Sequence, residues 1–279
     1  MPKTQDHRDQ GLEESSITKT PRIQRYLVAI EYIGTRFSGS QQQPNCRTVV
    51  GVLEDAGVGV HALSNVCHVD VERISKRKPG EVNEGDISMI DVRCDPNDFH
   101  ARFKAHERTY FYRLVSGPGP LTTLEKERAW HVQENLDLHA MQEACKVLVG
   151  HHDFSSFRAS GCQANSPIRT LDELHVCEVP ATPYFPSITE REQNSNDGKS
   201  NLEEFGVRRR HRCYVVTARA RSFLYHQVRL LVGVLKCAGT GELTTSDVAK
   251  ILNANTVTAA SPMTPACGLY LGRVKYDLP

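Results

Sequence analysis

The chain has 279 residues, of which 39% are hydrophobic and 24% are charged, so it can form a sizeable core and is not wholly disordered. Lys and Arg number 34 against 33 Asp and Glu, and the resulting net charge of +1 excludes a uniformly basic coat for nucleic acid. No apolar run approaches the ~18 to 20 residues of a membrane span. We therefore expect one large soluble domain or two small ones.

The nine cysteines are odd in number, and no two of them are spaced as Cys-x-x-Cys. Neither a disulfide framework nor a zinc knuckle fits this pattern, so we expect reduced and mostly buried thiols. His151 and His152 are adjacent, so they point to different sides of any regular element. Other histidines near candidate motifs lack a His-Glu-x-x-His pattern, namely His100, His106 and His226. We therefore expect no metal site.

The first half of the chain begins with a polar stretch, residues 1–22, which we expect to be a disordered tail. Runs rich in β-branched and aromatic residues follow and are typical of strands. We expect strands at residues 26–33, 87–93 and 109–115, and a short helix at 49–56. The Gly- and Pro-rich segment 116–120 is typical of a turn, so the expected halves are 24–118 and 119–279.

The second half begins with apolar residues at helical spacing from Leu138 to Val149, with Asp137 as the N-cap and Gly150 as the stop. Further strands are expected at 213–220 and 269–276, and further helices at 227–237 and at 247–252, with a cap near Thr245 or Ser246. The polar residues near 187–207 predict a mobile loop. Because strands and helices are mixed in both halves, the pattern predicts an α+β fold with one joined sheet.

One stretch of the chain is strongly basic. Between Gly206 and Gly241 there is no Asp or Glu, and the cations are Arg208, Arg209, Arg210, Arg212, Arg219, Arg221, Arg229 and Lys236. In a strand, Arg219 and Arg221 share one face. Aromatic residues interleave with these cations at Tyr214, Phe223 and Tyr225. Such a mixture suits RNA, through phosphate contact and base stacking, or else a solvated basic face beside an acidic loop.

Several short motifs occur in an order that resembles the TruA-type tRNA pseudouridine synthases. They lie at 30–39 with 41–43, 59–63, 98–103, 108–112, 150–158, 166–169, 223–229 and 268–271, so the resemblance covers about residues 25 to 277. The run from Val60 to Val71 resembles especially the animal branch of the family, which is linked to mitochondria. The acidic N-terminus argues against a mitochondrial presequence, so the compartment stays open, with a slight preference for mitochondria over the cytoplasm.

The resemblance implies a fold and an activity. The fold would have two similar halves whose antiparallel sheets merge into one extended sheet, with helices on one side and an active cleft between the halves. The family detaches uracil from its ribose, rotates it and rejoins it through carbon, without a cofactor. The partner would be tRNA, with the target uridine flipped into a pocket. Family members are often homodimers, so a second copy of the chain is a further expected partner.

The resemblance also implies roles for particular residues. One carboxylate acts as nucleophile or base, and Arg229 pairs with it and keeps it ionised. Tyr110 stacks on the base, although a tyrosine in a strand could also be a core residue. Leu269 and Leu271 would line the pocket floor, and Arg102, from the motif that ends at Phe103, would bind substrate.

The chain departs from the family at the carboxylate. The family motif reads Arg-Thr-Asp-Ala-Gly-Val-His, whereas residues 53–61 read Leu-Glu-Asp-Ala-Gly-Val-Gly-Val-His. Asp55, with Glu54 beside it, is the only carboxylate near the right place. The rest of the helix around Asp55 and the strand after it are expected to be missing, and a second shortening is expected between Glu81 and Ile87. Three hypotheses follow: an active enzyme that uses Asp55, a tRNA-binding homologue with impaired catalysis, and a chain that does not fold stably.

Overall fold

The computed structural model describes residues 23–36, 61–72, 87–94, 99–180, 211–257, 259–260 and 262–278. Three sequence predictions lie outside these residues: the tail at 1–22, the helix at 49–56 and the loop at 187–207. No helix in the described part of the chain is long and apolar enough to cross a bilayer.

The described residues form nine strands and three α-helices. The strands are β1 (Ile23–Tyr32), β2 (His61–Glu72), β3 (Ile87–Cys94), β4 (Ala105–Ser116), β5 (Trp130–Val132), β6 (Gly150–Asp153), β7 (Ile168–Val179), β8 (Arg212–Ala220) and β9 (Leu269–Tyr276). The helices are α2 (Leu138–Leu148), α4 (Gln227–Gly239) and α5 (Thr245–Asn253). The mixed α+β class predicted from the sequence is confirmed.

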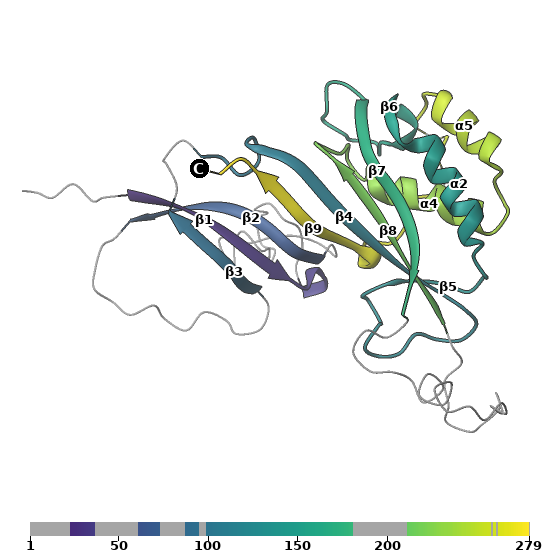
Figure 1. Cartoon of the computed structure of the whole chain (residues 1–279), viewed down its shortest axis with the longest axis horizontal. Helices are drawn as coiled ribbons and strands as arrows, with labels where there is room; N and C mark the ends of the chain where they lie inside the picture. The colour runs from purple at the N-terminus through teal and green to yellow at the C-terminus, as the bar shows by residue number, and fades with distance from the viewer. Residues whose placement is uncertain are drawn as a thin grey trace, which may run out of the picture.

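All nine strands belong to one sheet, in the order β3-β1-β2-β9-β4-β8-β7-β6, with β5 paired to β4. Neighbours are antiparallel except β2 with β9 and β4 with β5, which are parallel. The strand nearest the end of the sequence, β9, therefore lies between β2 and β4 and joins strands from both parts of the chain (Figure 1). The division into halves at 24–118 and 119–279 stays a prediction.

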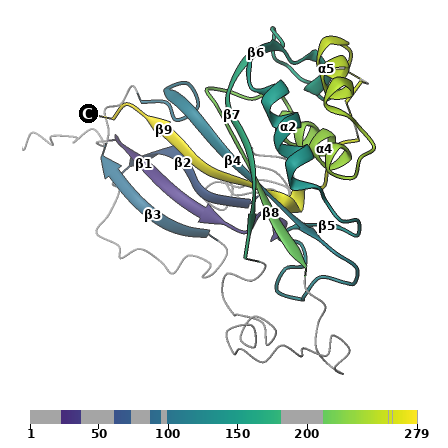
Figure 2. The same ribbon diagram turned by 45° about the vertical axis from the view of Figure 1, so that its right-hand side comes forward.

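The α-helices lie together beside β7 and β8, and both views show β1 to β3 at the opposite end, with no described α-helix near them (Figures 1 and 2). The main core lies between the sheet and the helices. In β8, buried residues such as Tyr214, Val216 and Ala218 alternate with more exposed ones, so one face of the strand points into this core. These residues pack against apolar side chains of all three helices. A smaller cluster joins β1 to β2 through Ile30, Tyr32 and Ala62.

The helix ends show how far local signals determine the structure. In α2, the carboxylate of Asp137 accepts a hydrogen bond from the backbone N–H of Ala140 at 3.1 Å, so the predicted N-cap is confirmed. The predicted cap of α5 at Thr245 or Ser246 is wrong by one residue or two. Thr244 is the cap, because its hydroxyl and the Asp247 carboxylate form a reciprocal capping box.

The eight cysteines in the described part of the chain are all free thiols. Cys145 and Cys213 are buried, and five others are partly buried. Cys94, on the edge strand β3, is exposed.

Candidate active site

A row of directly opposed residues crosses the sheet where β9 joins β2 to β4. Tyr32 lies opposite Ala62, Ala62 opposite Leu271, and Leu271 opposite Tyr110. Opposed residues in paired strands point to the same face, so these side chains lie in one line. This face is also the one that the helices cover further along, because Tyr110 lies opposite Ala218 of the main core.

Tyr110 is half-buried in this row. Its ring meets the edge of the Phe223 ring at a centroid distance of 5.2 Å and an angle of 88°. Burial raises the pKa of the Tyr110 hydroxyl above its usual value, so the phenol stays neutral. The residue therefore offers an uncharged aromatic surface next to Leu271, which is the arrangement that base stacking needs.

Arg229 lies in the first turn of α4 and is held by Thr264, a buried residue of the loop before β9. Its Nε donates to the carbonyl oxygen of Thr264 at 2.6 Å. The Thr264 hydroxyl in turn donates to the carbonyl oxygen of Arg229 at 3.0 Å. Neither terminal nitrogen of this guanidinium bonds to a described residue, so the two-pronged end of the side chain is available to a carboxylate or to substrate.

Tyr112 and Leu269 complete the surroundings of Arg229. They lie opposite each other in β4 and β9, and the Tyr112 hydroxyl donates to the carbonyl oxygen of Pro265 at 2.7 Å. Burial is the main reason why the pKa of Arg229 is below its usual value, and an arginine remains protonated at neutral pH even so.

Two of the predicted substrate-binding residues, Tyr110 and Leu269, lie on the neighbouring strands β4 and β9. Tyr110 and Tyr112 share a face and are two residues apart, about 7 Å along the strand. Leu269 is opposite Tyr112 and belongs to the main core, whereas Leu271 is opposite Tyr110 and half-buried. Asp55, the predicted catalytic carboxylate, lies outside the described residues.

Arg102 lies in the loop before β4 and is connected to the same face through Arg108. One terminal nitrogen of Arg108 donates to the carbonyl oxygen of Arg102 at 3.0 Å, and the other donates to that of Arg221 at 2.8 Å. Arg108 and Tyr110 share a face of β4, since they are two residues apart. The side chains of Arg102 and Arg221 are both exposed.

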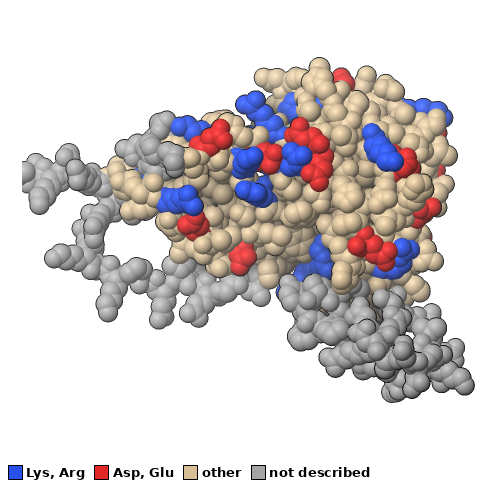
Figure 3. Space-filling view, in the orientation of Figure 1, with Lys and Arg blue, Asp and Glu red and all other residues tan. Residues whose placement is uncertain are grey.

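The basic stretch is much less basic in space than in sequence. Arg212 pairs with Glu178 at 2.7 Å, and Arg219 pairs with Glu107 at 3.1 Å and Glu173 at 3.0 Å. Lys236 likewise pairs with two glutamates. On the face shown in Figure 3, basic and acidic side chains lie side by side. Three described cations of the stretch are therefore neutralised, mostly by carboxylates from neighbouring strands, whereas Arg208, Arg209 and Arg210 lie outside the described residues.

His61 was not predicted to have a role, yet it connects the segment after β1 with the segment before β5. Its Nδ1 accepts from the backbone N–H of Gly34 at 3.3 Å, and its Nε2 lies 3.1 Å from the carbonyl oxygen of Glu127. The ring stacks on Tyr270 at 4.5 Å. Burial lowers the pKa of His61, which favours the neutral ring that these contacts require. His61 lies on the face opposite to Tyr110, so its contacts are structural.

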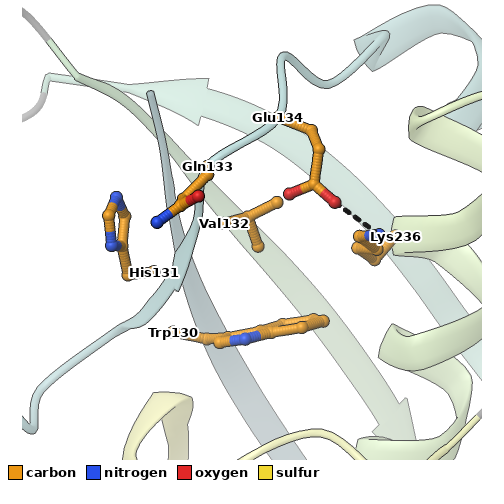
Figure 4. A pocket seen from close by; sticks show the side chains of 6 residues that line it. All are labelled: Trp130, His131, Val132, Gln133, Glu134 and Lys236. Atoms are coloured by element: carbon orange, nitrogen blue, oxygen red, sulfur yellow. Dashed lines mark ion pairs between the residues drawn. The ribbon is translucent and has the colours of Figure 1, made fainter. Parts of the chain in front are cut away.

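A pocket of about 690 Å³ lies beside β5, away from the row that contains Tyr110. It is lined by Trp130, His131, Val132, Gln133, Glu134 and Lys236 (Figure 4). The Glu134 carboxylate and the Lys236 ammonium, 3.0 Å apart, lie side by side at its wall. None of the predicted site residues lines this pocket. Among the described residues no three His, Cys, Asp or Glu side chains are grouped closely enough to hold a metal ion.

Comparisons with known proteins match most of the chain to one family. A family model described as tRNA pseudouridine synthase matches residues 144–277. A curated protein named tRNA pseudouridine synthase A, from Paramagnetospirillum magneticum, is 38% identical over 276 residues that cover 91% of this chain and 95% of the relative. The protein of the same name from Rhodospirillum centenum is 37% identical over 277 residues, covering 91% of this chain and 100% of the relative.

Proposed function

The chain belongs to the tRNA pseudouridine synthase family, a family of isomerases, and on that premise we propose that it converts uridine into pseudouridine in tRNA. Two observations support the proposal. Relatives that bear this enzyme name match almost the full length of the chain. The guanidinium of Arg229 is fixed by Thr264 while its terminal nitrogens bond to no described residue.

The proposed chemistry needs no cofactor. The bond between uracil N1 and the ribose C1′ breaks, and a bond between C5 and C1′ forms after the base has rotated. The hydrogen on C5 leaves as a proton, and N1 gains one, so the product is an isomer of the substrate. The base must leave the stacked helix of the tRNA before any of this, at a cost of a few kcal/mol.

We assign the following roles. Asp55 is the ionised carboxylate, acting as nucleophile or base. Arg229 pairs with it, because a guanidinium binds a carboxylate through two parallel hydrogen bonds and favours its ionised form. Tyr110 stacks on the flipped uracil, and Leu271, opposite Tyr110, packs beside the base. Leu269 supports that floor from the core, and Arg102 contacts the RNA backbone.

The alternative is a tRNA-binding homologue with impaired catalysis. The observation that favours it is the altered spacing between Asp55 and His61, with two residues more than the family motif has. We propose that the chain has lost elements of the family's structure at two places, around Asp55 and before Ile87. The two functions differ in their dependence on Asp55.

Release of tritium from tRNA labelled at uracil C5 tests the proposal. We expect the wild-type chain to release tritium, and Asp55→Asn to lower the rate about 10²- to 10⁴-fold, the usual contribution of such a group. Glu54→Gln is the matched control, because it removes the neighbouring carboxylate and should leave the rate unchanged. A folded wild-type chain that binds tRNA and releases no tritium supports the alternative. The same samples, measured by light scattering, test the expected homodimer.

A further inference from the structure

Arg108 of β4 and Arg219 of β8 lie on opposite faces of the sheet and have different kinds of partner. On the face away from Tyr110, Arg219 lies between Glu107 and Glu173 and bonds to both carboxylates. On the face of Tyr110, the bonds of Arg108 to described residues all go to backbone carbonyl oxygens. Ion pairs therefore neutralise the charge on one face, and the charge on the other face has no described carboxylate against it.

Arg108 brings two further arginines to the same place. Its guanidinium is one small planar group, and it bonds at one end to the carbonyl of Arg102 and at the other to that of Arg221. The backbones of residues 102 and 221, which are far apart in sequence, thus lie on either side of a single side chain. The side chains of Arg102 and Arg221 are exposed, and neither forms an ion pair with any described residue.

We propose that Arg102 and Arg221, positioned by Arg108, form a phosphodiester-binding site for the RNA strand next to the flipped uridine. In its reference to tRNA this inference rests on the proposed function. Arginine suits the role, because its planar fork of donors matches the oxygens of a phosphate group. Arg108 is two residues from Tyr110 on the same face, so the site lies within about one nucleotide of the stacking ring.

The adjacent loop adds an aromatic surface. Phe103 is 75% exposed, and its ring lies 4.3 Å from that of His100, which in turn lies 4.7 Å from that of His68. A phosphate held by Arg102 would bring the neighbouring base to Phe103, where it can stack on the exposed ring.

The salt dependence of tRNA binding tests the site. Each phosphate that a cation neutralises releases counterions, so losing one contact lowers the slope of log Kd against log salt by about 0.7–0.9. We expect Arg221→Gln and Arg102→Gln each to lower the slope by this amount between about 50 and about 200 mM salt. Arg221→Lys retains the charge and should keep most of the slope. Arg212→Gln is the matched control, because Arg212 is exposed but bound to Glu178 through both prongs.

Two outcomes would overturn the site. One is an unchanged slope for Arg221→Gln in a chain whose thermal melt matches the wild type. The other is an equal loss of slope for Arg212→Gln, which would mean that tRNA responds to the overall positive charge of the protein and not to a particular site. The result is separable from the proposed isomerase activity, because binding is measured without turnover. A wild-type chain that binds tRNA with a steep slope and releases no tritium leaves the phosphate site standing and rejects the enzyme.

Discussion

Arg229 and Thr264 hold each other through two hydrogen bonds that run in opposite directions. The arginine Nε donates to the threonine carbonyl at 2.6 Å, and the threonine hydroxyl donates to the arginine carbonyl at 3.0 Å. Thr264 is 2% exposed, so both bonds lie where water competes little. The first bond fixes the direction of the guanidinium, and the second fixes the start of α4 against the loop before β9.

Thr264→Val should therefore reduce turnover more than it reduces stability. The hydroxyl bond is worth about 1 kcal/mol of unfolding free energy, and its loss also loosens the backbone that carries Arg229. We expect kcat for tritium release to fall several-fold with little change in KM. Thr264→Ser keeps the hydroxyl and should restore kcat. The Val substitution should also cost less in an Arg229→Lys background, since the two residues act together. Equal rates for the Ser and Val variants would contradict this coupling.

Gly268→Ala should lower the stability of the chain near Arg229, through a steric clash with β4. A Cβ at this position would lie 2.5 Å from Cε1 of Tyr112 and 2.8 Å from the carbonyl oxygen of Arg113. The carbonyl cannot move without disturbing β4, so we expect a loss of about 1–3 kcal/mol of unfolding free energy in denaturant titration. Tyr112→Phe is the comparison, because it removes the hydroxyl bond to Pro265 without a clash and should cost only about 1 kcal/mol. A Gly268→Ala chain as stable as the wild type would show that the backbone of β4 can shift at Arg113 without loss of stability.

Because Arg219 pairs with both Glu107 and Glu173, its removal should leave the two carboxylates to repel each other. Arg219→Gln leaves Glu107 and Glu173 without their shared cation, so the variant should unfold at a lower temperature than the wild type. Added salt should reduce the difference, because it screens like charges. The double variant Arg219→Gln/Glu173→Gln should recover part of the loss. No recovery would mean that the effect comes from packing of the arginine stem.

Glu242 predicts an acid-sensitive contact at the end of α4. The Lys236 ammonium and the Thr240 hydroxyl bond to its carboxylate and lower its pKa from 4.5 to about 2. Because the pKa is lower in the folded chain, this contribution to stability is present above pH 4.5 and is lost as the pH falls toward about 2. Thermal melts of wild type and Glu242→Gln should therefore differ at pH 7 and converge at low pH. A difference that persists at low pH would exclude the carboxylate as its source.

Local patterns predicted the parts of the fold that depend on local physics. The strand at 269–276 agrees with β9 residue for residue, because β-branched and aromatic residues there meet a clear turn at Gly268. The capping carboxylate of Asp137 was equally visible, since a cap and its target are three residues apart. The strands β2 and β7 were not identified. Each mixes charged and apolar residues in a way that only pairing with neighbouring strands explains.

The residues of the candidate site likewise fall into two groups, those that sequence motifs indicate and those that only the fold brings together. Tyr110 and Arg229 came from motif resemblance, and the structure adds what no motif contains, namely Thr264 as the support of Arg229 and Arg108 as the bridge between Arg102 and Arg221. The sequence could not show that Arg212 and Arg219 are paired, because Glu107, Glu173 and Glu178 are remote in sequence and adjacent only across the sheet. Charge counted along a chain omits partners that the fold brings in.

The position of β9 has a consequence for synthesis. Every other described strand leaves the ribosome before β9, yet β9 is the piece that links β2 to β4. A nascent chain can therefore pair β1, β2 and β3 in one group and β4, β7 and β8 in another, with an open edge on each. Until β9 has been synthesised and has left the ribosome, those edges have no partner strand from this part of the chain, so the row from Tyr32 to Tyr110 first exists when β9 pairs with β2 and β4.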